Sequence, residues 1–290
     1  MGDDTLPYRY LADCHSHSDC SFDGTEDMSR MCARAEALGL AYYAVTDHCE
    51  CDQYEGSEQF GGRKYYDVVR RAYRELEVNQ KRFPRLHLLK GIELGQPLQN
   101  LPAALDALDG RQYDFVIGSL HNIANMPDFY HLGNQAFEAD ELDRVFHAYF
   151  KEIYEMLEWG QFDSLAHITY PLRYLCKPGE HPSFAKYQAE LDDIFRKIIA
   201  DGKALEFNTS RLLKTDAPIL PDREIFARYK ALGGTRVTLG ADAHCTENIA
   251  KGIPEALDLL RALGYTEFTV FVNRKPIQIP IEWEPDNERK

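Results

Sequence analysis

The chain has 290 residues, of which 44% are hydrophobic and 28% charged, as in ordinary globular proteins. No run of about 18 apolar residues is present and the first residues do not resemble a secretory signal, so we expect no membrane span. The formal net charge of −14 argues against binding of long nucleic acids, but a small anionic substrate stays possible. Seven cysteines without a pairing pattern predict free thiols and a cytoplasmic protein.

Strands and helices are predicted to alternate along the chain. In chain order, we expect strands at 8–15, 41–48, 86–94, 113–121, 162–168, 204–210 and 236–244. Helices are expected at 27–39, 63–83, 101–110, 140–160, 184–202, 222–234 and 254–264, before a last extended segment at 267–276. Repeated strand–helix units predict parallel strands, in a barrel or in a doubly wound sheet. No linker or repeat divides the chain, so we expect one domain over 1–290.

Residues of the types that bind metals fall at one end of these strands. His15 and His17 are two residues apart, so a strand would direct both imidazoles to the same face. The last residues of six of the seven strands include a His, Asp or Glu, namely His15, His17, His48, Glu93, His121, His167, Asp242 and His244. Each alone would more often be a core histidine, an ion-pair partner or a turn cap. Their common place at the carboxyl ends of parallel strands favours a functional site.

Together with Asp23, these residues give nine potential ligands, which suits two or three ions better than one. Imidazoles and carboxylates without a thiolate favour zinc, manganese or iron over magnesium or calcium. His131 lies in a long loop over 122–139 that could reach the site. Asn208 ends the sixth strand, where we expect it to form a hydrogen bond near the site or to contact the substrate.

The order of short motifs resembles that of the polymerase-and-histidinol-phosphatase (PHP) superfamily. The matching pieces are H-x-H (His15, His17), S-x-D-G (21–24), T-D-H (His48), G-I-E (Glu93), S-x-H (His121), A-H (His167) and D-A-H (Asp242, His244). They cover about residues 10–245 in the family's order. The resemblance implies an α/β fold, a distorted (β/α)₇ barrel with a trinuclear metal site at the C-terminal ends of its strands.

The family's ligand pattern, carried over to these positions, implies three metal sites. The first would use His15, His17, Glu93 and Asp242. The second would share Glu93 and add His121 and His167. The third would use Asp23, His48 and His244, with Asp23 standing where other members have a histidine.

Three segments, "GIELGQP", "SLHNIANMPDFY" and "AHITYPLRY", resemble the histidinol-phosphate phosphatase branch. This resemblance implies hydrolysis of a phosphate monoester by a metal-bridging hydroxide, in histidine biosynthesis. Arg173 is expected to bind the phosphate, because a phosphate-contacting arginine stands at this position in the branch and its guanidinium suits a dianion. Arg63 and His131 are weaker phosphate-binding candidates, and Asp242 or His244 would assist the leaving oxygen.

Other readings stay open at this point. A related phosphoesterase could act on a nucleotide, a phosphotyrosyl protein or a cyclic diester, and an inactive metal-binding interaction module would need the same ligands. The side chains expected near the rest of the substrate are Tyr54, Glu55, Phe129, Tyr130 and Tyr170. The sequence gives neither the native metals nor the oligomeric state.

Overall fold

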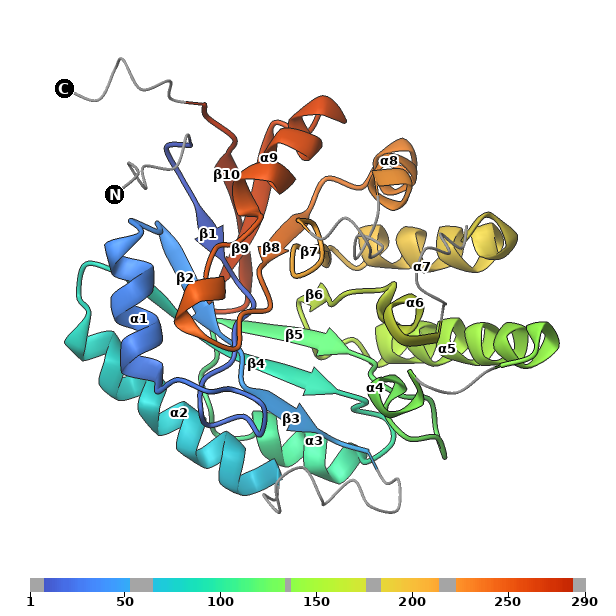
Figure 1. Cartoon of the computed structure of the whole chain (residues 1–290), viewed down its shortest axis with the longest axis horizontal. Coiled ribbons are helices and arrows are strands. Elements are labelled where there is room, and N and C mark those ends of the chain that lie inside the picture. The colour runs from blue at the N-terminus through green and yellow to red at the C-terminus, as the bar shows by residue number, and fades with distance from the viewer. Residues whose placement is uncertain (1–7, 53–64, 134–136, 176–183, 214–222, 284–290) are drawn as a thin grey trace.

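A computed structural model describes residues 8–52, 65–133, 137–175, 184–213 and 223–283 (Figure 1). Its centre is an eight-stranded parallel sheet in the order β1-β2-β4-β5-β6-β7-β8, with β3 beside β4. The strands are β1 (Ala12–Asp13), β2 (Tyr42–Val45), β3 (His48–Glu50), β4 (His87–Gly95), β5 (Phe115–Ser119), β6 (Ser164–Leu165), β7 (Ala204–Asn208) and β8 (Val237–Gly240). Every described residue of β5, β7 and β8 is buried, as expected for parallel strands covered on both faces.

The strands β2 and β3 occupy one position in the barrel. Tyr42 pairs with His87 and His48 pairs with Glu93, so both strands follow β4 in the same register. Only Thr46 and Asp47 interrupt them. The eight strands therefore fill seven positions, which are the seven strands predicted from the sequence.

The first and last strands meet and nearly close the sheet on itself. The amide of Cys14 donates to the carbonyl of Leu239 at 2.8 Å, and the amide of Asp242 donates to the carbonyl of His15 at 2.8 Å. A parallel bridge joins Ser16 to Ala243 just beyond these bonds. The predicted (β/α)₇ barrel is confirmed, and the doubly wound alternative is wrong because its first and last strands would not pair.

Helices surround the strands, with α1, α2 and α3 on one side and α5 and α7 on the other (Figure 1). Their bounds are α1 (Met28–Ala37), α2 (Tyr65–Arg82), α3 (Leu101–Leu108), α4 (Phe129–Leu132), α5 (Ala139–Trp159), α6 (Tyr170–Leu175), α7 (Gln188–Ala200), α8 (Arg223–Ala231) and α9 (Ile253–Ala262). Two 3₁₀ turns, η2 (Phe184–Tyr187) and η3 (Thr246–Asn248), precede α7 and α9. The longest of the described helices, α5, starts at a capping box of Glu138 and Glu141 and ends at Gly160 in the left-handed region. No helix in the described ranges is long and apolar enough to cross a membrane.

The structure differs from the predicted elements at three places. Helices α4 and α6 lie in segments predicted as loops, so Arg173 is on a short helix and not in a loop. The last extended segment is instead an antiparallel hairpin of β9 (Glu267–Val272) and β10 (Lys275–Pro280). Its turn residues Asn273 and Arg274 both have positive φ, as a tight two-residue hairpin turn requires. The single domain over 1–290 stays a prediction.

Candidate metal centre

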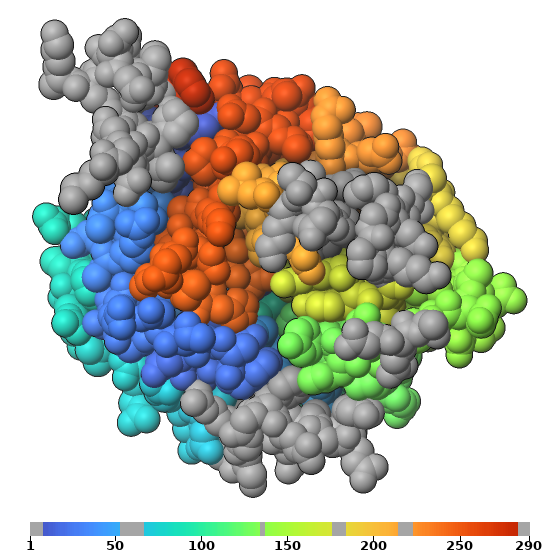
Figure 2. Space-filling view, viewed as in Figure 1, coloured from blue at the N-terminus to red at the C-terminus, as the bar shows by residue number. Residues whose placement is uncertain are grey.

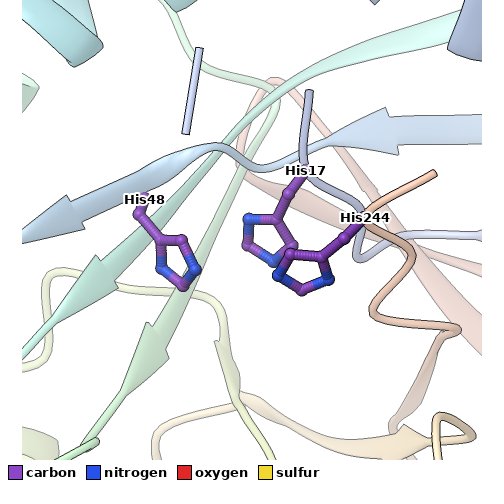
Figure 3. Close-up of side chains that lie close together, drawn as sticks. All are labelled: His17, His48 and His244. Carbon is purple, nitrogen blue, oxygen red and sulfur yellow. The ribbon is translucent and has the colours of Figure 1, made fainter. Parts of the chain in front are cut away.

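The carboxyl ends of the strands bring the predicted ligands into one cluster. Figure 3 shows His17, His48 and His244 with their rings facing one another, although they come from distant segments. The ring centroid of His17 is 4.2 Å from that of His48 and 4.4 Å from that of His244. Within the described ranges, four triads have ligand atoms within 4.8 Å of one another: His17–His48–His244, His15–His17–Glu93, His48–Glu50–His121 and Glu93–His121–His167.

Glu93 lies at the centre of this cluster and is fully buried. Its Oε1 is 3.1 Å from His167 Nε2 and 3.2 Å from His121 Nε2. Its Oε2 is 2.9 Å from His48 Nδ1, 3.4 Å from His15 Nε2 and 3.5 Å from His17 Nε2. One carboxylate therefore faces five imidazoles, with its two oxygens turned to different histidines, as a residue shared by two ions would be.

Asp242 completes the first side of the cluster. Its Oδ1 is 3.3 Å from His17 Nε2 and 3.8 Å from His15 Nε2. Asn208 donates to its Oδ2 at 3.4 Å, which is the hydrogen bond near the site expected of that residue. The backbone of Asp242 has φ of +53°, a conformation in which Asp is tolerated better than most residues.

The rim of the cluster is formed by Asp23 and His244. Asp23 Oδ2 is 3.0 Å from His244 Nε2 and 3.6 Å from His48 Nε2. The side chains of Asp23 and His244 are 36% and 31% exposed, whereas that of Glu93 is 1% exposed. In the space-filling view, blue, orange and green segments meet around a narrow hollow (Figure 2).

The loop that carries Asp23 is fixed by its own polar side chains. The buried carboxylate of Asp47 accepts hydrogen bonds from both the amides and the hydroxyls of Ser18 and Ser21. Gly24 follows Asp23 in the S-x-D-G motif, and a Cβ there would lie 1.9 Å from the carbonyl oxygen of Ser18. The glycine of this motif is therefore required by close backbone packing.

Several buried polar atoms of the cluster have no hydrogen-bond partner among the described residues. They are His15 Nε2, both ring nitrogens of His17, His48 Nδ1, His167 Nδ1 and Glu93 Oε2. Each such atom costs about 1–3 kcal/mol when it stays unpaired. Among them, His15 Nε2 and His17 Nε2 converge on oxygens of Glu93 and Asp242. Imidazole nitrogens beside carboxylate oxygens are the ligand set of divalent metal ions, so these residues fit the metals expected from the sequence.

Burial and neighbouring charge displace the pKa values of several residues in the cluster. Burial raises the pKa of Glu93, but the surrounding histidines outweigh it and hold that pKa well below its ordinary value. Burial lowers the pKa of His15, but Glu206, Glu93 and Asp242 outweigh it and raise that pKa well above 6.5. His17 is the opposite case, since burial and the neighbouring histidines lower its pKa to about 3. Without a metal, the carboxylates therefore hold protons on His15, His48 and His121, and these positions favour added positive charge.

Two carboxylates beside the ligands were not assigned from the sequence. Glu206, on β7, accepts a hydrogen bond from His15 Nδ1 at 2.5 Å and another from the His167 amide at 2.9 Å. Glu50, on β3, lies 2.9 Å from His48 Nδ1 and 3.2 Å from His121 Nδ1. A signal was present for both, because each is two residues from a strand-end residue and so shares its face.

Arg173 lies on α6, the short helix that follows His167. Its Nε is buried and has no hydrogen-bond partner in the described part of the chain, and its guanidinium carbon is 5.2 Å from the Tyr174 ring. On the same helix, the Tyr170 ring is 4.9 Å from that of His121 and 5.0 Å from that of His167. Arg173 therefore belongs to a helix that packs directly on the cluster.

The other residues predicted to contact the substrate differ in burial, and some lie outside the described residues. Phe129 is fully buried in the core, so the prediction that it contacts substrate is wrong. Tyr130 is 64% exposed, and the ring of exposed His131 is 5.3 Å from the Tyr130 ring on α4. A substrate role for His131 stays a prediction. Three further candidates, Arg63, Tyr54 and Glu55, lie outside the described residues.

Two proteins of similar sequence carry the name histidinol-phosphatase, one of them as probable. A protein from Thermotoga maritima named probable histidinol-phosphatase is 26% identical over 261 residues, which is 90% of this chain and 95% of that protein. The histidinol-phosphatase of Lactococcus lactis subsp. lactis is 26% identical over 265 residues, 91% of this chain and 95% of that protein.

Solved structures show the same fold. The crystal structure of histidinol phosphate phosphatase from Lactococcus lactis subsp. lactis, complexed with zinc, L-histidinol and phosphate, has a TM-score of 0.78 and 24% identity, and covers 92% of this chain and 98% of that one. The putative histidinol phosphatase of Listeria monocytogenes has a TM-score of 0.70 and 19% identity over 83% of this chain and 98% of that one. The family model of the PHP domain matches residues 13–210, more than half of the chain. With its barrel and its histidine–carboxylate cluster, the chain belongs to the PHP domain family.

Proposed function

We propose that this chain is a metal-dependent phosphate monoester hydrolase that acts on L-histidinol phosphate, and so serves histidine biosynthesis in the cytoplasm. The observation that carries the proposal is Glu93, a buried carboxylate that faces five imidazoles at the carboxyl ends of the strands. The names of the relatives that align over about nine tenths of the chain support the substrate. The whole chain, 1–290, is one such domain.

The ions are held by nine side chains in three sets. His15, His17, Glu93 and Asp242 bind the first ion. Glu93 also binds the second, with His121 and His167. Asp23, His48 and His244 bind the third, and the triad of His17, His48 and His244 supports this position.

The bound ions supply Lewis acids for the phosphoryl oxygens and water with a pKa near neutrality. Zinc, manganese and iron all suit the ligands. Arg173 binds the phosphate dianion from the side of α6, because the buried Nε has a hydrogen to donate and no partner in the described structure. This guanidinium orients the ester and offsets charge that develops on the phosphoryl oxygens.

The leaving alcohol departs at the rim of the cluster. His244 is the most exposed of the six clustered histidines, with a side chain 31% exposed, and its Nδ1 is 2.9 Å from the carbonyl oxygen of Asp242. This exposure supports the proposal that Asp242 and His244 assist proton delivery to the leaving oxygen. The remainder of the substrate meets Tyr170 and Asp128, which are joined by a hydrogen bond of 3.1 Å. A carboxylate beside an aromatic ring suits the amine and the imidazole of histidinol.

The test is phosphate release by metal-replete protein. L-histidinol phosphate is compared with a nucleotide 3′-phosphate, phosphotyrosine, a cyclic diester and an aryl phosphate, with His121→Ala as the blank. We expect kcat/KM for histidinol phosphate to exceed the others by orders of magnitude. Equal turnover of all esters would remove the substrate but leave the phosphoesterase chemistry. An inactive protein with its metals bound would favour an interaction module.

A further inference from the structure

Glu50 is a carboxylate in contact with two proposed metal ligands that serve different ions. It ends β3, and its side chain is only 10% exposed. Glu50 Oε1 lies 2.9 Å from Nδ1 of His48, which is proposed for the third ion. The same oxygen lies 3.2 Å from Nδ1 of His121, which is proposed for the second ion. No other role in the proposed reaction uses this residue.

Both histidines turn their other nitrogen toward the proposed ion sites. Nε2 of His121 faces Glu93 at 3.2 Å, and Nε2 of His48 faces Asp23 at 3.6 Å. An imidazole that binds a metal through Nε2 carries its hydrogen on Nδ1, where a carboxylate commonly accepts it. Glu93 Oε2 is also 2.9 Å from His48 Nδ1, but Glu93 is itself a proposed ligand of two ions. Glu50 is therefore the carboxylate that remains for both Nδ1–H groups: it is hydrogen-bonded to His121 Nδ1 and lies at ion-pair distance, 2.9 Å, from His48 Nδ1.

The "GIELGQP" segment holds Glu50 in this position. The side-chain amide of Gln96 donates to Glu50 Oε2 at 2.6 Å, and its carbonyl accepts from the backbone amide of His121 at 2.8 Å. Gly95 leaves the space that the carboxylate fills, since a Cβ there would lie 2.5 Å from Glu50 Oε2. The segment thus supplies a ligand, Glu93, and two residues that support Glu50.

We propose that Glu50 is a positioning residue shared by the second and third ions. Its carboxylate fixes the Nδ1–H tautomer and the ring orientation of His48 and His121 together. Binding at the two ion positions is therefore coupled through Glu50. This inference rests on the ligand sets of the proposed function.

The experiment compares Glu50→Gln with Glu152→Gln in the full chain. Glu152 is a matched control because, like Glu50, it accepts a hydrogen bond from a glutamine side-chain amide, here that of Gln99. It also accepts one from the backbone amide of Ala124. Zinc affinity and stoichiometry are measured by competition with a chromophoric chelator. The histidine tautomers are read in parallel from long-range ¹H–¹⁵N NMR correlations.

We expect Glu50→Gln to weaken two of the three zinc ions together, by roughly 10–100-fold, the usual effect of losing such a supporting carboxylate. The ring signals of His48 and His121 lose their single Nδ1–H tautomer, while those of His15 keep theirs. Glu152→Gln binds zinc as the parent does. Gln96→Ala, which leaves Glu50 and both imidazoles in place, weakens the same two ions to a smaller extent.

Two results would overturn the proposal. Parent-like zinc affinity in Glu50→Gln would show that Glu50 does not position the two histidines. Loss of a single ion at saturating zinc, with the other two bound normally, would make Glu50 a direct ligand instead. Because the probe is zinc alone, these outcomes are independent of whether histidinol phosphate is the substrate.

Discussion

Replacement of Glu206 by glutamine tests whether the layer of carboxylates behind the ligands holds the metal centre together. Glu206 is 1% exposed and accepts three hydrogen bonds, from His15 Nδ1 at 2.5 Å, the His167 amide at 2.9 Å and the Asn208 amide at 3.3 Å. Glutamine has nearly the same shape but one acceptor oxygen, and its NH₂ group would face a donor. The substitution therefore removes charge and acceptors without opening a cavity.

The magnitude follows from those contacts. A hydrogen bond to a charged group contributes about 1.5–3 kcal/mol, and a buried donor left without an acceptor costs about 1–3 kcal/mol. With one acceptor retained, we expect the free energy of unfolding of the zinc-free chain to fall by about 2–4 kcal/mol. The affinity of the ion held by His15 and His17 should fall by roughly 10–100-fold, since His15 loses the acceptor that orients it.

A matched control exists on the surface. His147 Nδ1 lies 2.8 Å from Glu190 Oε1, but these side chains are 51% and 34% exposed. The same exchange, Glu190→Gln, should cost less than about 1 kcal/mol, because water replaces the lost contact. Urea denaturation of the zinc-free chains and chelator competition for zinc measure both quantities. The role assigned to Glu206 is refuted if Glu206→Gln has the same free energy of unfolding as the parent. It is also refuted if Glu190→Gln loses as much stability as Glu206→Gln, because burial would then not explain the contribution of Glu206.

Three further outcomes are expected. Burial lowers the pKa of His15, His48 and His121, but nearby carboxylates outweigh it and hold these pKa values well above 6.5. Protonation of these histidines therefore stabilises the metal-free fold. This stabilisation is complete below pH 6.5 and is lost as the pH rises through the raised pKa values. Zinc binding at pH 7 should accordingly release protons, and calorimetric heats that do not vary with the ionisation enthalpy of the buffer would contradict this. Arg173→Ala should raise KM for the phosphate ester by about 10–100-fold while the metal content stays unchanged. This factor corresponds to the loss of a charge-assisted hydrogen bond of about 1.5–3 kcal/mol. An unchanged KM would show that Arg173 does not bind the phosphate. Gly240→Ala should lower the free energy of unfolding by about 1–3 kcal/mol, because the new Cβ would lie 2.4 Å from His15 Cβ. A thermal melt like that of the parent would show that the two strands can move apart without loss of stability.

Most of the proposed ligands could be grouped from the sequence because they lie at or just after the carboxyl ends of the strands. Parallel strands in a closed sheet bring their carboxyl ends together, so the position within a strand was enough to place His121 and His167 beside Glu93. The position within a strand was not enough to predict the carboxylates that contact the proposed ligands. Glu50 meets His121, 71 positions away, only because β3 and β5 both flank β4 in a fixed register. Such contacts depend on the register between strands, which no single segment contains.

Short elements were missed for a different reason. Helix α6 has six residues, too few for a helical period to be seen, and it follows Thr169 directly after the strand-end residues. The turn of the last hairpin is Asn273-Arg274, without the glycine that usually marks such a turn. Asp114 accepts from the Asn273 amide at 3.0 Å, so a partner distant in sequence helps to hold the turn.

The position of Asp23 at the rim explains why this predicted ligand can differ from the family's pattern. Glu93 and His17 are surrounded by other ligands and have 1% or less of their side chains exposed, so a change at either would disturb several contacts at once. Asp23 is on a loop, is 36% exposed and meets two histidines of the cluster, His48 and His244. Burial raises the pKa of Asp23, but these two histidines outweigh it and hold that pKa well below its usual range, so the carboxylate stays ionised. An aspartate at the rim therefore exchanges a neutral donor for an anionic one without altering the buried part of the site, and adds negative charge where the third ion is proposed.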